Sequence, residues 1–198
     1  RDTARSRSAL QIPVVFVSLV SHAGYLRQEI DGNGRQIDHA DPWFHANWCT
    51  PLNAMVAIDL EERTVWIRGL LYIHTSPLGD AVPIILLDTD LDENNAADRE
   101  ITHYLYGGDQ TYRLKQEAVL GIGGVRTLQA LGFDIHTYHM NEGHSALLTL
   151  ELLRRHPWRG GRPDESGLRY DFEQVLDHCI FTTHTPIEAG QDRFPYPL

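Results

Sequence analysis

The chain has 198 residues, of which 42% are apolar and 22% are charged, a composition typical of globular proteins that bury a sizeable core. Its 17 basic and 27 acidic residues give a formal charge of −10, which would repel a phosphate backbone and argues against a nucleic-acid partner. No apolar run is long enough to span a membrane and no secretory leader pattern occurs, so we expect a cytoplasmic protein without a membrane partner. The only two cysteines, Cys49 and Cys179, lie far apart in the sequence, which also fits that location.

The first forty residues predict a helix, a strand and a hairpin. Residues 1–10 resemble the last turns of a helix, so we expect further residues upstream of them in a longer protein. IPVVFVSLV (12–20) is a continuous β-branched run, which is typical of a parallel strand buried on both faces. GYLRQEI is followed by DGNG at residues 31–34, a strong signal for a hairpin turn.

Three strands are predicted next. AMVAIDL (54–60) and TVWIRGLLYI (64–73) flank the short polar turn EER, which predicts an antiparallel pair. VPIILLDTD (82–90) reads as a buried strand that ends in two carboxylates, Asp88 and Asp90.

Two helices follow these strands. A helix over roughly 98–106 could be capped by Asn94, Asn95 or Asp98. Residues 109–131 show helical spacing, and Gly132 is placed to end that helix. GIGG (121–124) lies inside the second helix and not at a strand-to-helix turn, so close helix packing is a better interpretation than phosphate binding.

The last part of the chain alternates strand and helix. DIHTYHM (134–140) predicts a strand that leads into a helix starting near Glu142, and YDFEQVLDH (170–178) predicts a helix before the strand CIFTTHT (179–185). This alternation predicts an α/β fold with a largely parallel, Rossmann-like sheet and an antiparallel hairpin flap.

Polar side chains cluster where two of the predicted strands end. Asn141, Glu142, Gly143 and His144 follow one strand, and His184 lies among threonines at the end of the other. Ligands of open α/β sheets bind beyond the carboxyl ends of strands, and a helix N-terminus there would favour anions or hydroxyl oxygens. The clusters therefore suit a polyhydroxylated ligand such as a sugar, although Asn141 could equally be a helix N-cap.

Two other kinds of site are alternatives. A zinc-dependent hydrolase would need several ligands on one face, but His136 and His139 are three residues apart on a strand and so point to opposite faces. We therefore expect no metal site. A paired-carboxylate hydrolase could use Glu142 with Glu188 or Asp192, but no spacing rule supports such a pair.

Five stretches, in collinear order, resemble the α-glucan (glycogen/maltodextrin) phosphorylases, and most of all the shorter bacterial and archaeal type. These stretches are PVVFVSLVSHAGYLRQEIDGNGRQ, VPIILLDTDLDENNAADREIT, LYGGDQTYRLKQEAVLGIGGVRTLQALG, YHMNEGHSALLTLELL and CIFTTHTPIEAGQDRF. The resemblance implies that residues 1–198 are part of the N-terminal Rossmann-like domain of a glycosyltransferase-B architecture. That family releases glucose 1-phosphate from α-1,4-glucans by phosphorolysis and uses the phosphate group of pyridoxal phosphate as a proton relay.

The resemblance also implies roles for five residues. His184 matches a histidine that contacts the glucosyl unit at the cleavage site. Glu142 and His144 match residues that line the same pocket, and Asn141 comes just before them. Arg113 matches an arginine near the sugar.

Other parts of the family's active site have no counterpart here. The glycine-rich phosphate loop lies upstream of the matched region, and the lysine that carries the cofactor lies in the C-terminal half. The chain's single lysine, Lys115, does not match that lysine. We therefore expect no pyridoxal phosphate in this chain alone, which would be inactive without the C-terminal half.

The resemblance leaves two functions open. The first is a fragment of a phosphorylase that acts on glucan and phosphate and, as is usual for that family, forms a homodimer. The alternative is a non-catalytic domain of the same fold that binds maltooligosaccharide without turnover.

Overall fold

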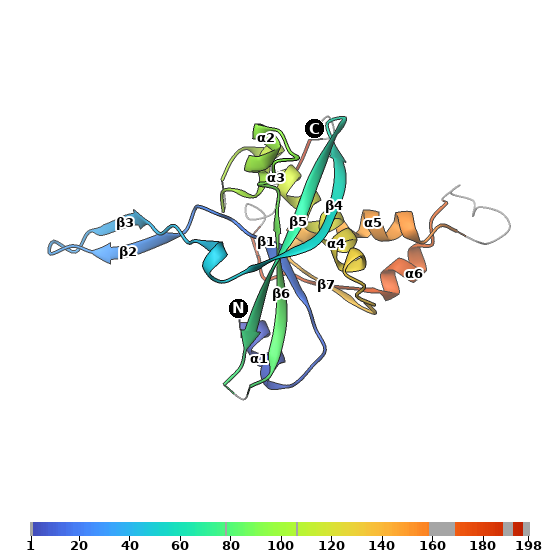
Figure 1. The fold of residues 1–198 in the computed structure, drawn as a ribbon, viewed down its shortest axis with the longest axis horizontal. Helices are drawn as coiled ribbons and strands as arrows, with labels where there is room; N and C mark the ends of the chain where they lie inside the picture. The colour runs from blue at the N-terminus through green and yellow to red at the C-terminus, as the bar shows by residue number, and fades with distance from the viewer. Residues whose placement is uncertain (1, 78, 106, 159–168, 188–191, 196–198) are drawn as a thin grey trace.

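The computed structural model describes residues 2–77, 79–105, 107–158, 169–187 and 192–195 (Figure 1). The strands are β1 (Phe16–Leu19), β2 (Leu26–Ile30), β3 (Gln36–Ala40), β4 (Thr50–Leu60), β5 (Arg63–Thr75), β6 (Ala81–Asp88), β7 (Tyr138–Asn141) and β8 (Cys179–Thr182). The helices are α1 (Asp2–Ala9), α2 (Ala96–Arg99), α3 (Gln110–Ala118), α4 (Gly124–Ala130), α5 (Leu148–Arg155) and α6 (Phe172–Asp177). Short 3₁₀ turns form at η1 (His45–Asn47), η2 (Glu100–Thr102) and η4 (Gly143–Ser145), and a π-helical turn forms at η3 (Val119–Gly123).

The central sheet is mixed, with strand order β1-β6-β5-β4. The pairs β4–β5 and β5–β6 are antiparallel, and only β1–β6 is parallel. The α/β class is confirmed, but the prediction of a largely parallel sheet is wrong. The connection from β4 to β5 is the two-residue turn 61–62, and that from β5 to β6 covers only residues 76–80. Connections this short can join only antiparallel neighbours, because a parallel crossover needs a dozen residues or more.

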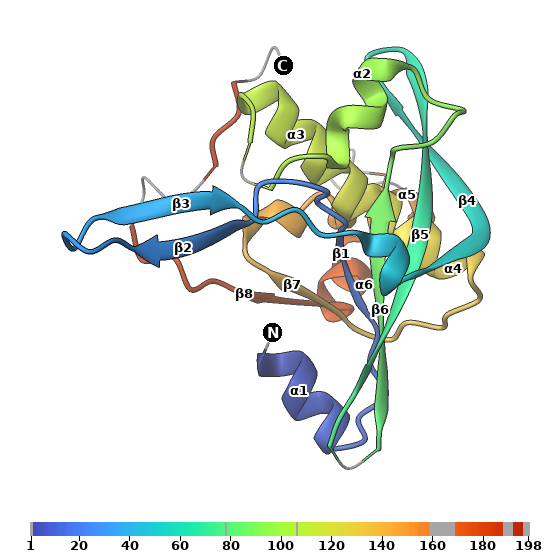
Figure 2. The same ribbon diagram turned by 60° about the vertical axis from the view of Figure 1, so that its left-hand side comes forward.

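Two smaller sheets complete the strands that the structure describes. β2 and β3 form the predicted antiparallel hairpin, which extends away from the body of the molecule in both views (Figures 1 and 2). β7 and β8 form a separate parallel pair in which Asn141 lies opposite Thr182. The last residues of these two strands are therefore neighbours, so the polar residues that follow them come close together.

Several predicted elements differ in detail from the structure. β1 is a short strand with β6 as its paired neighbour in the described chain and with Ser18 exposed, so it is not buried on both faces. The helix predicted at 98–106 is shorter and begins earlier, with α2 running directly into η2. Its N-cap is Asn95, whose side chain accepts from the Asp98 N–H at 2.9 Å.

The main core lies between the central sheet and the long helical segment formed by α3, η3 and α4. Its fully buried side chains come from the inner face of the sheet and from the facing helical residues, namely Ile58, Val65, Ile67, Ile85, Leu87, Ile101, Ala118, Val119 and Leu128. A smaller cluster around Val125, Met140 and Leu152 fixes α5 and β7 against the same helical segment. The packing of α5 thus positions the carboxyl end of β7.

The glycines of GIGG allow this close packing, as predicted. A Cβ atom on Gly121 would lie 2.5 Å from the backbone nitrogen of Leu148, and one on Gly123 would lie 2.5 Å from the Ile67 side chain. The first of these contacts involves backbone, which cannot move without displacing α5.

We expect Gly121→Ala to lower the free energy of unfolding by about 1–3 kcal/mol, because it overpacks the contact between η3 and α5. Chemical denaturation measures the change. Gly32→Ala is the matched control, since a Cβ atom at Gly32 would meet nothing within 4 Å. Equal stability of the two variants would contradict the close-packing interpretation.

Candidate functional site

The candidate site is a polar cluster at the carboxyl ends of the parallel strands β7 and β8. The two strand ends are joined beyond the ladder by the Glu142 N–H, which donates to the carbonyl of Thr182 at 2.9 Å. The side chains of Asn141, Glu142 and His184 all project from this junction. Two hydrogen bonds in this cluster join His184 to residues that are 42 and 43 positions away in sequence. These residues meet because β7 and β8 run parallel and end side by side.

Glu142 organises the cluster through its carboxylate. Oε1 accepts from the backbone N–H of His184, and Oε2 accepts from the hydroxyl of Thr183 at 3.2 Å. The imidazole Nε2 of His184 lies 3.2 Å from Oδ1 of Asn141. The N–H of His184, followed by the hydroxyls of Thr183 and Thr185, lowers the pKa of Glu142 below its usual value. Glu142 is therefore ionised at neutral pH.

The backbone of Glu142 is strained. Its φ of +67° and ψ of 174° lie in a region that is populated almost only by glycine. A non-glycine residue persists there only when surrounding interactions hold it, and such residues occur frequently at functional sites. The strained backbone and the ordered carboxylate therefore occur at one residue.

The helix that was predicted to start near Glu142 begins later. Asn141 is the last residue of β7, the turn η4 follows, and α5 begins only at Leu148. The interpretation of Asn141 as an N-cap is thus wrong, and none of the α-helices that the structure describes begins at the cluster. Polar contacts in the cluster come from side chains and from strand-end backbone.

His144 and Arg113 lie on two neighbouring elements. His144 is exposed in η4, and α3 packs against that turn. Arg113 projects from α3 and forms an ion pair with Asp192, with Nη2 and Oδ2 2.6 Å apart. Gln110, one turn earlier on α3, donates to the carbonyl of Arg193 at 3.1 Å. These contacts hold residues 192–193 against α3 and place Asp192 beside Arg113.

Sequence reasoning missed the threonines and Asp192 as structural partners of the predicted residues. The sequence analysis gave Thr182 and Thr183 no role, yet the Thr183 hydroxyl donates to Glu142 and the Thr182 hydroxyl lies 2.7 Å from Nε2 of His139. The only available signal was the run of hydroxyl residues TTHT at a strand end. Asp192 was considered as a carboxylate partner for Glu142, but its nearest charged partner is Arg113; Glu188 lies outside the described residues.

Glu117 also lies near this second group of residues. The residue is 8% exposed, and the charges of Asp192 and Arg113 act on its carboxyl group. Burial, followed by the negative charge of Asp192, raises the pKa of Glu117 to about 7, although Arg113 lowers it in part.

We expect Glu117→Gln to be more stable than the original chain above pH 7, by roughly 1–3 kcal/mol. The folded state holds the Glu117 proton up to about pH 7, whereas the unfolded chain releases it near 4.5, so stability falls as pH rises through this window. Denaturation at a series of pH values measures this difference, which should vanish below pH 4.5. Glu173→Gln, the same substitution at an exposed position on α6, is the matched control.

Neither a metal nor a lysine-bound cofactor finds suitable residues here. In the part of the chain that the structure describes, no three histidine, cysteine or acidic side chains are arranged to hold a metal ion. His136 is 87% exposed at its side chain and lies 3.5 Å from Asp134. Nζ of Lys115 forms an ion pair with Glu61 at 2.9 Å, so the residues present do not fit the lysine link of pyridoxal phosphate.

The carboxylates predicted at the end of β6 have structural partners. Asp88 is buried and accepts from the Thr102 hydroxyl and the Asp90 N–H, and His22 Nε2 lies 3.0 Å from it. The hydrogen bond to Asp88 raises the pKa of His22. This group joins the ends of β1 and β6 and contains none of the predicted sugar contacts.

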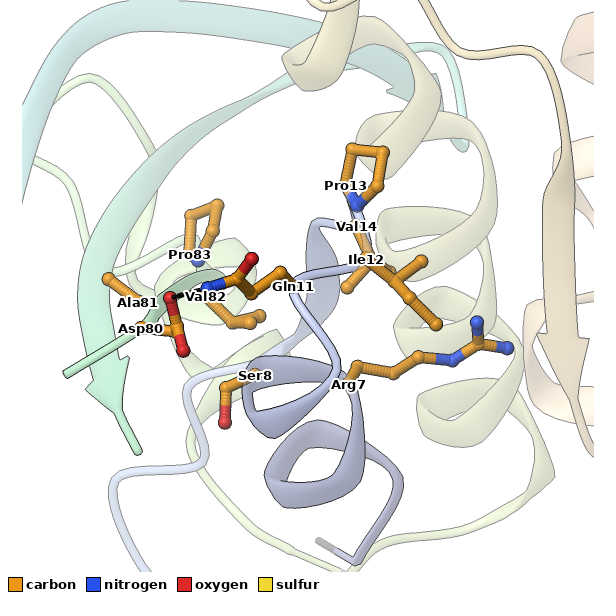
Figure 3. Close-up of a pocket in the computed structure, with 10 residues that line it drawn as sticks. All are labelled: Arg7, Ser8, Gln11, Ile12, Pro13, Val14, Asp80, Ala81, Val82 and Pro83. Atoms are coloured by element: carbon orange, nitrogen blue, oxygen red, sulfur yellow. Dashed lines mark hydrogen bonds between the residues drawn. The ribbon is translucent and has the colours of Figure 1, made fainter. Parts of the chain in front are cut away.

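A hollow of about 500 Å³ lies elsewhere, between α1 and the start of β6 (Figure 3). Gln11 crosses it and donates to Oδ1 of Asp80 at 2.9 Å. The described residues that line it include none of the predicted sugar contacts.

Among the helices that the structure describes, none has both the length and the apolar character needed to cross a bilayer.

The fold and the cluster together define an α/β protein with a polar, hydroxyl-rich site at its strand ends. Comparison with known proteins is more specific, although no protein-family model matches the chain. The chain is 36% identical over 204 residues to a maltodextrin phosphorylase of Thermococcus litoralis, with 98% of this chain and 23% of that protein covered. It is 36% identical over its full length to a glycogen phosphorylase of Mycobacterium tuberculosis (23% covered) and 29% identical to one of Aquifex aeolicus (28% covered).

These matches confirm the resemblance that the sequence motifs indicated. The chain is similar over its whole length to part of the N-terminal region of glycogen and maltodextrin phosphorylases, and it spans about a quarter of the length of these relatives.

Proposed function

We propose that this chain forms the sugar-side wall of the active site of an α-1,4-glucan phosphorylase. The observation that carries the proposal is that Asn141, Glu142 and His184, three of the five residues assigned by resemblance to the sugar pocket, lie in one cluster in a chain that is similar throughout to phosphorylases. On this proposal residues 1–198 are part of an N-terminal Rossmann-like domain in a glycosyltransferase-B architecture.

The geometry suggests a division of roles between Glu142 and His184. The carboxylate of Glu142 fixes the loop after β8 by accepting the His184 N–H, so the imidazole is held beside the amide of Asn141. The imidazole and the amide then offer a fixed pair of groups to hydroxyls of the terminal glucosyl unit. Positive charge builds on that unit as its bond breaks, and the negative charge of Glu142 is placed to stabilise it.

Arg113 and His144 supply further donors on the neighbouring elements α3 and η4. Asp192 keeps the guanidinium of Arg113 in place until a sugar hydroxyl can share it.

The phosphate side of the reaction needs groups outside these 198 residues. Pyridoxal phosphate, which the resemblance implies for the family, would supply a phosphate group for proton transfer if the rest of a longer protein bound it. The one lysine here is engaged by Glu61, so we expect the rest of a longer protein to bind this cofactor and the phosphate substrate. The chain alone is then expected to be inactive.

A titration with maltoheptaose tests the sugar-side role. We expect weak binding that perturbs the His184 imidazole signal in NMR spectra, and no glucose 1-phosphate when inorganic phosphate is added. His184→Ala should weaken binding at least about tenfold, the loss expected for a hydrogen bond to a charged or strongly polar group. His136→Ala, at an exposed position, is the matched control. Binding that is indifferent to His184→Ala would reject the site.

A second measurement separates the enzyme from the non-catalytic sugar-binding domain. The intact mass and visible absorbance of the natural gene product report its length and any lysine-bound pyridoxal phosphate. A much longer product that carries the cofactor supports the phosphorylase, whereas a product of about this size that binds maltoheptaose supports the binding domain.

A further inference from the structure

Just beyond the carboxyl end of β1, His22 meets Asp88, the last residue of β6. Nε2 of His22 lies 3.0 Å from Oδ1 of Asp88, and the two side chains are 13% and 7% exposed. We propose that this pair is a proton-operated clamp, which holds η2 against the central sheet while His22 carries a proton and loosens η2 when the proton leaves. The inference does not depend on the proposed function. The contacts of the clamp are buried within these 198 residues, so no surface of the chain has to be free.

Asp88 connects β6 to η2 through the hydroxyl of Thr102. Oδ1 of Asp88 accepts from that hydroxyl at 3.1 Å and from the Asp90 N–H at 3.0 Å. The Thr102 hydroxyl in turn accepts from the Thr89 N–H at 3.0 Å, and both threonines are fully buried. The position of the Asp88 carboxylate therefore determines how η2 lies on the end of β6.

A buried carboxylate needs a positive charge close by, because burial of an unpaired charge is costly. His22 supplies this charge only while both of its ring nitrogens carry protons. A neutral imidazole can still donate one hydrogen bond to Asp88, but it leaves the negative charge uncompensated. Loss of the proton therefore favours an arrangement in which water reaches Asp88. For this to happen η2 must move, because its Thr102 side chain contacts the carboxylate.

The surroundings of His22 favour its protonated form. The hydrogen bond to Asp88 raises the pKa of His22 despite burial, and three neighbouring carboxylates act in the same direction. The stabilisation is therefore fully present below the ordinary pKa of 6.5 and is lost as pH rises through the raised pKa. Two further imidazole rings lie 4.8 and 5.7 Å from the His22 ring, centroid to centroid. The titratable groups that face His22 are thus His45 of η1, Asp88, Asp90, Glu100 of η2 and His103.

The backbone beside His22 is bonded to the segment that follows η2. The Ala23 N–H donates to the carbonyl of His103 at 2.8 Å, and the Leu105 N–H donates to the carbonyl of Ala23 at 2.9 Å. A Cβ atom on Gly24 would lie 2.7 Å from the carbonyl oxygen of Leu105, so the two segments are in direct contact. We therefore expect a change at His22 to reach η2 through the backbone as well as through Asp88.

η2 is also bound to α3, the helix that carries Arg113. The Tyr112 hydroxyl donates to the carbonyl of Glu100 at 2.8 Å, and the Gln116 amide donates to the carbonyl of Ile101 at 2.9 Å. Loosening of η2 thus weakens two contacts that hold α3. The clamp therefore connects a protonation event at the end of the sheet to the position of this helix.

Hydrogen exchange of the chain at about pH 6 and about pH 8.5, corrected for the intrinsic pH dependence of exchange, tests the clamp. We expect the protection of the Ala23, Thr89 and Leu105 amides to fall at least about threefold at the higher pH, because these amides are bonded across the clamp. Amides in the middle of the β4–β5 ladder should keep their protection and serve as the internal reference.

Two substitutions at His22 fix its charge. His22→Arg stays charged at both pH values, so protection should no longer fall as pH rises. His22→Gln is neutral, so protection should be low at both pH values. His136→Gln is the matched control, because the His136 side chain is 87% exposed, and this variant should keep the pH dependence of the original chain.

NMR titration of the imidazole measures the charge of His22 directly. We expect its midpoint to lie above that of the histidines in the same chain unfolded in urea, and to fall toward that value in Asp88→Asn. A His22 midpoint at or below the unfolded value would overturn the proposal. So would protection that does not change with pH in the original chain, or a fall in protection that persists in both His22→Arg and His22→Gln.

Discussion

Replacement of Glu151 with alanine is expected to lower the free energy of unfolding by about 3–5 kcal/mol, the typical cost of removing one partner from a buried ionic network. Glu151 is 2% exposed and accepts hydrogen bonds from three arginines. Arg154 and Arg155 lie on its own helix at i+3 and i+4, each 2.7 Å from Oε1, and Arg126 of α4 lies 3.0 Å from Oε2.

The cost is high because Glu151 links three elements. Arg126 also donates to the carbonyl of Ala57 in β4, so the network joins α5, α4 and the central sheet. Without the carboxylate, Arg126 would be left half-buried beside two other cations with no counter-charge. Thermal and urea denaturation of Glu151→Ala measure the loss. Glu93→Ala, at an exposed loop position, should change stability by no more than about 0.5 kcal/mol.

The same network predicts a pH dependence. Burial alone would raise the pKa of Glu151, but hydrogen bonds from Arg154 and Arg126 outweigh burial and lower it from 4.5 to about 2. The stabilisation from this carboxylate is therefore fully present above pH 4.5 and is lost as pH falls through about 2. Glu151→Gln should make the stability of the chain less sensitive to acid in that window. Unchanged acid sensitivity in this variant would contradict the assigned network.

Local patterns predicted the elements better than the direction of the strands. The turn DGNG and the apolar runs around EER are local signals, and the corresponding hairpins form as predicted. The continuous run VPIILL predicted a buried strand, and β6 is largely buried inside the sheet. Burial, and not strand direction, produces such a run. The largely parallel sheet was predicted from the alternation of strands and helices, yet two of the three strand pairs of that sheet are antiparallel. The short connections between β4 and β5 and between β5 and β6 were the correct signal for antiparallel pairing.

The site was predictable to the extent that it depends on strand ends. Asn141, Glu142 and His184 could be grouped because adjacent parallel strands end at one edge. The pairing of Arg113 with Asp192 is a side-chain contact across 79 residues, and no periodicity encodes it. The strained backbone of Glu142 was not predictable either, because a glutamate gives no sign of a positive φ.

That strain leads to a test that separates structure from function at a single residue. Glu142→Ala keeps a Cβ atom at φ +67° and removes the carboxylate, whereas Glu142→Gly removes both the carboxylate and the strain. At an ordinary position glycine is less stable than alanine. Here we expect the order to reverse, with a higher melting temperature for Glu142→Gly than for Glu142→Ala, because glycine alone adopts this conformation without cost.

Binding should not follow stability in this pair. Both variants lose the acceptor that holds the His184 N–H, so we expect both to bind maltoheptaose at least about tenfold more weakly than the original chain. Glu142→Gln, which keeps an oxygen for that N–H but no charge, should fall between them and the original chain. Calorimetric melting and maltoheptaose titration of the same samples provide both measurements. A glycine variant that gains stability and still binds normally would mean that ligand binding needs neither the strain nor the carboxylate of Glu142. A gain in stability with loss of binding is what a residue strained for its ligand requires.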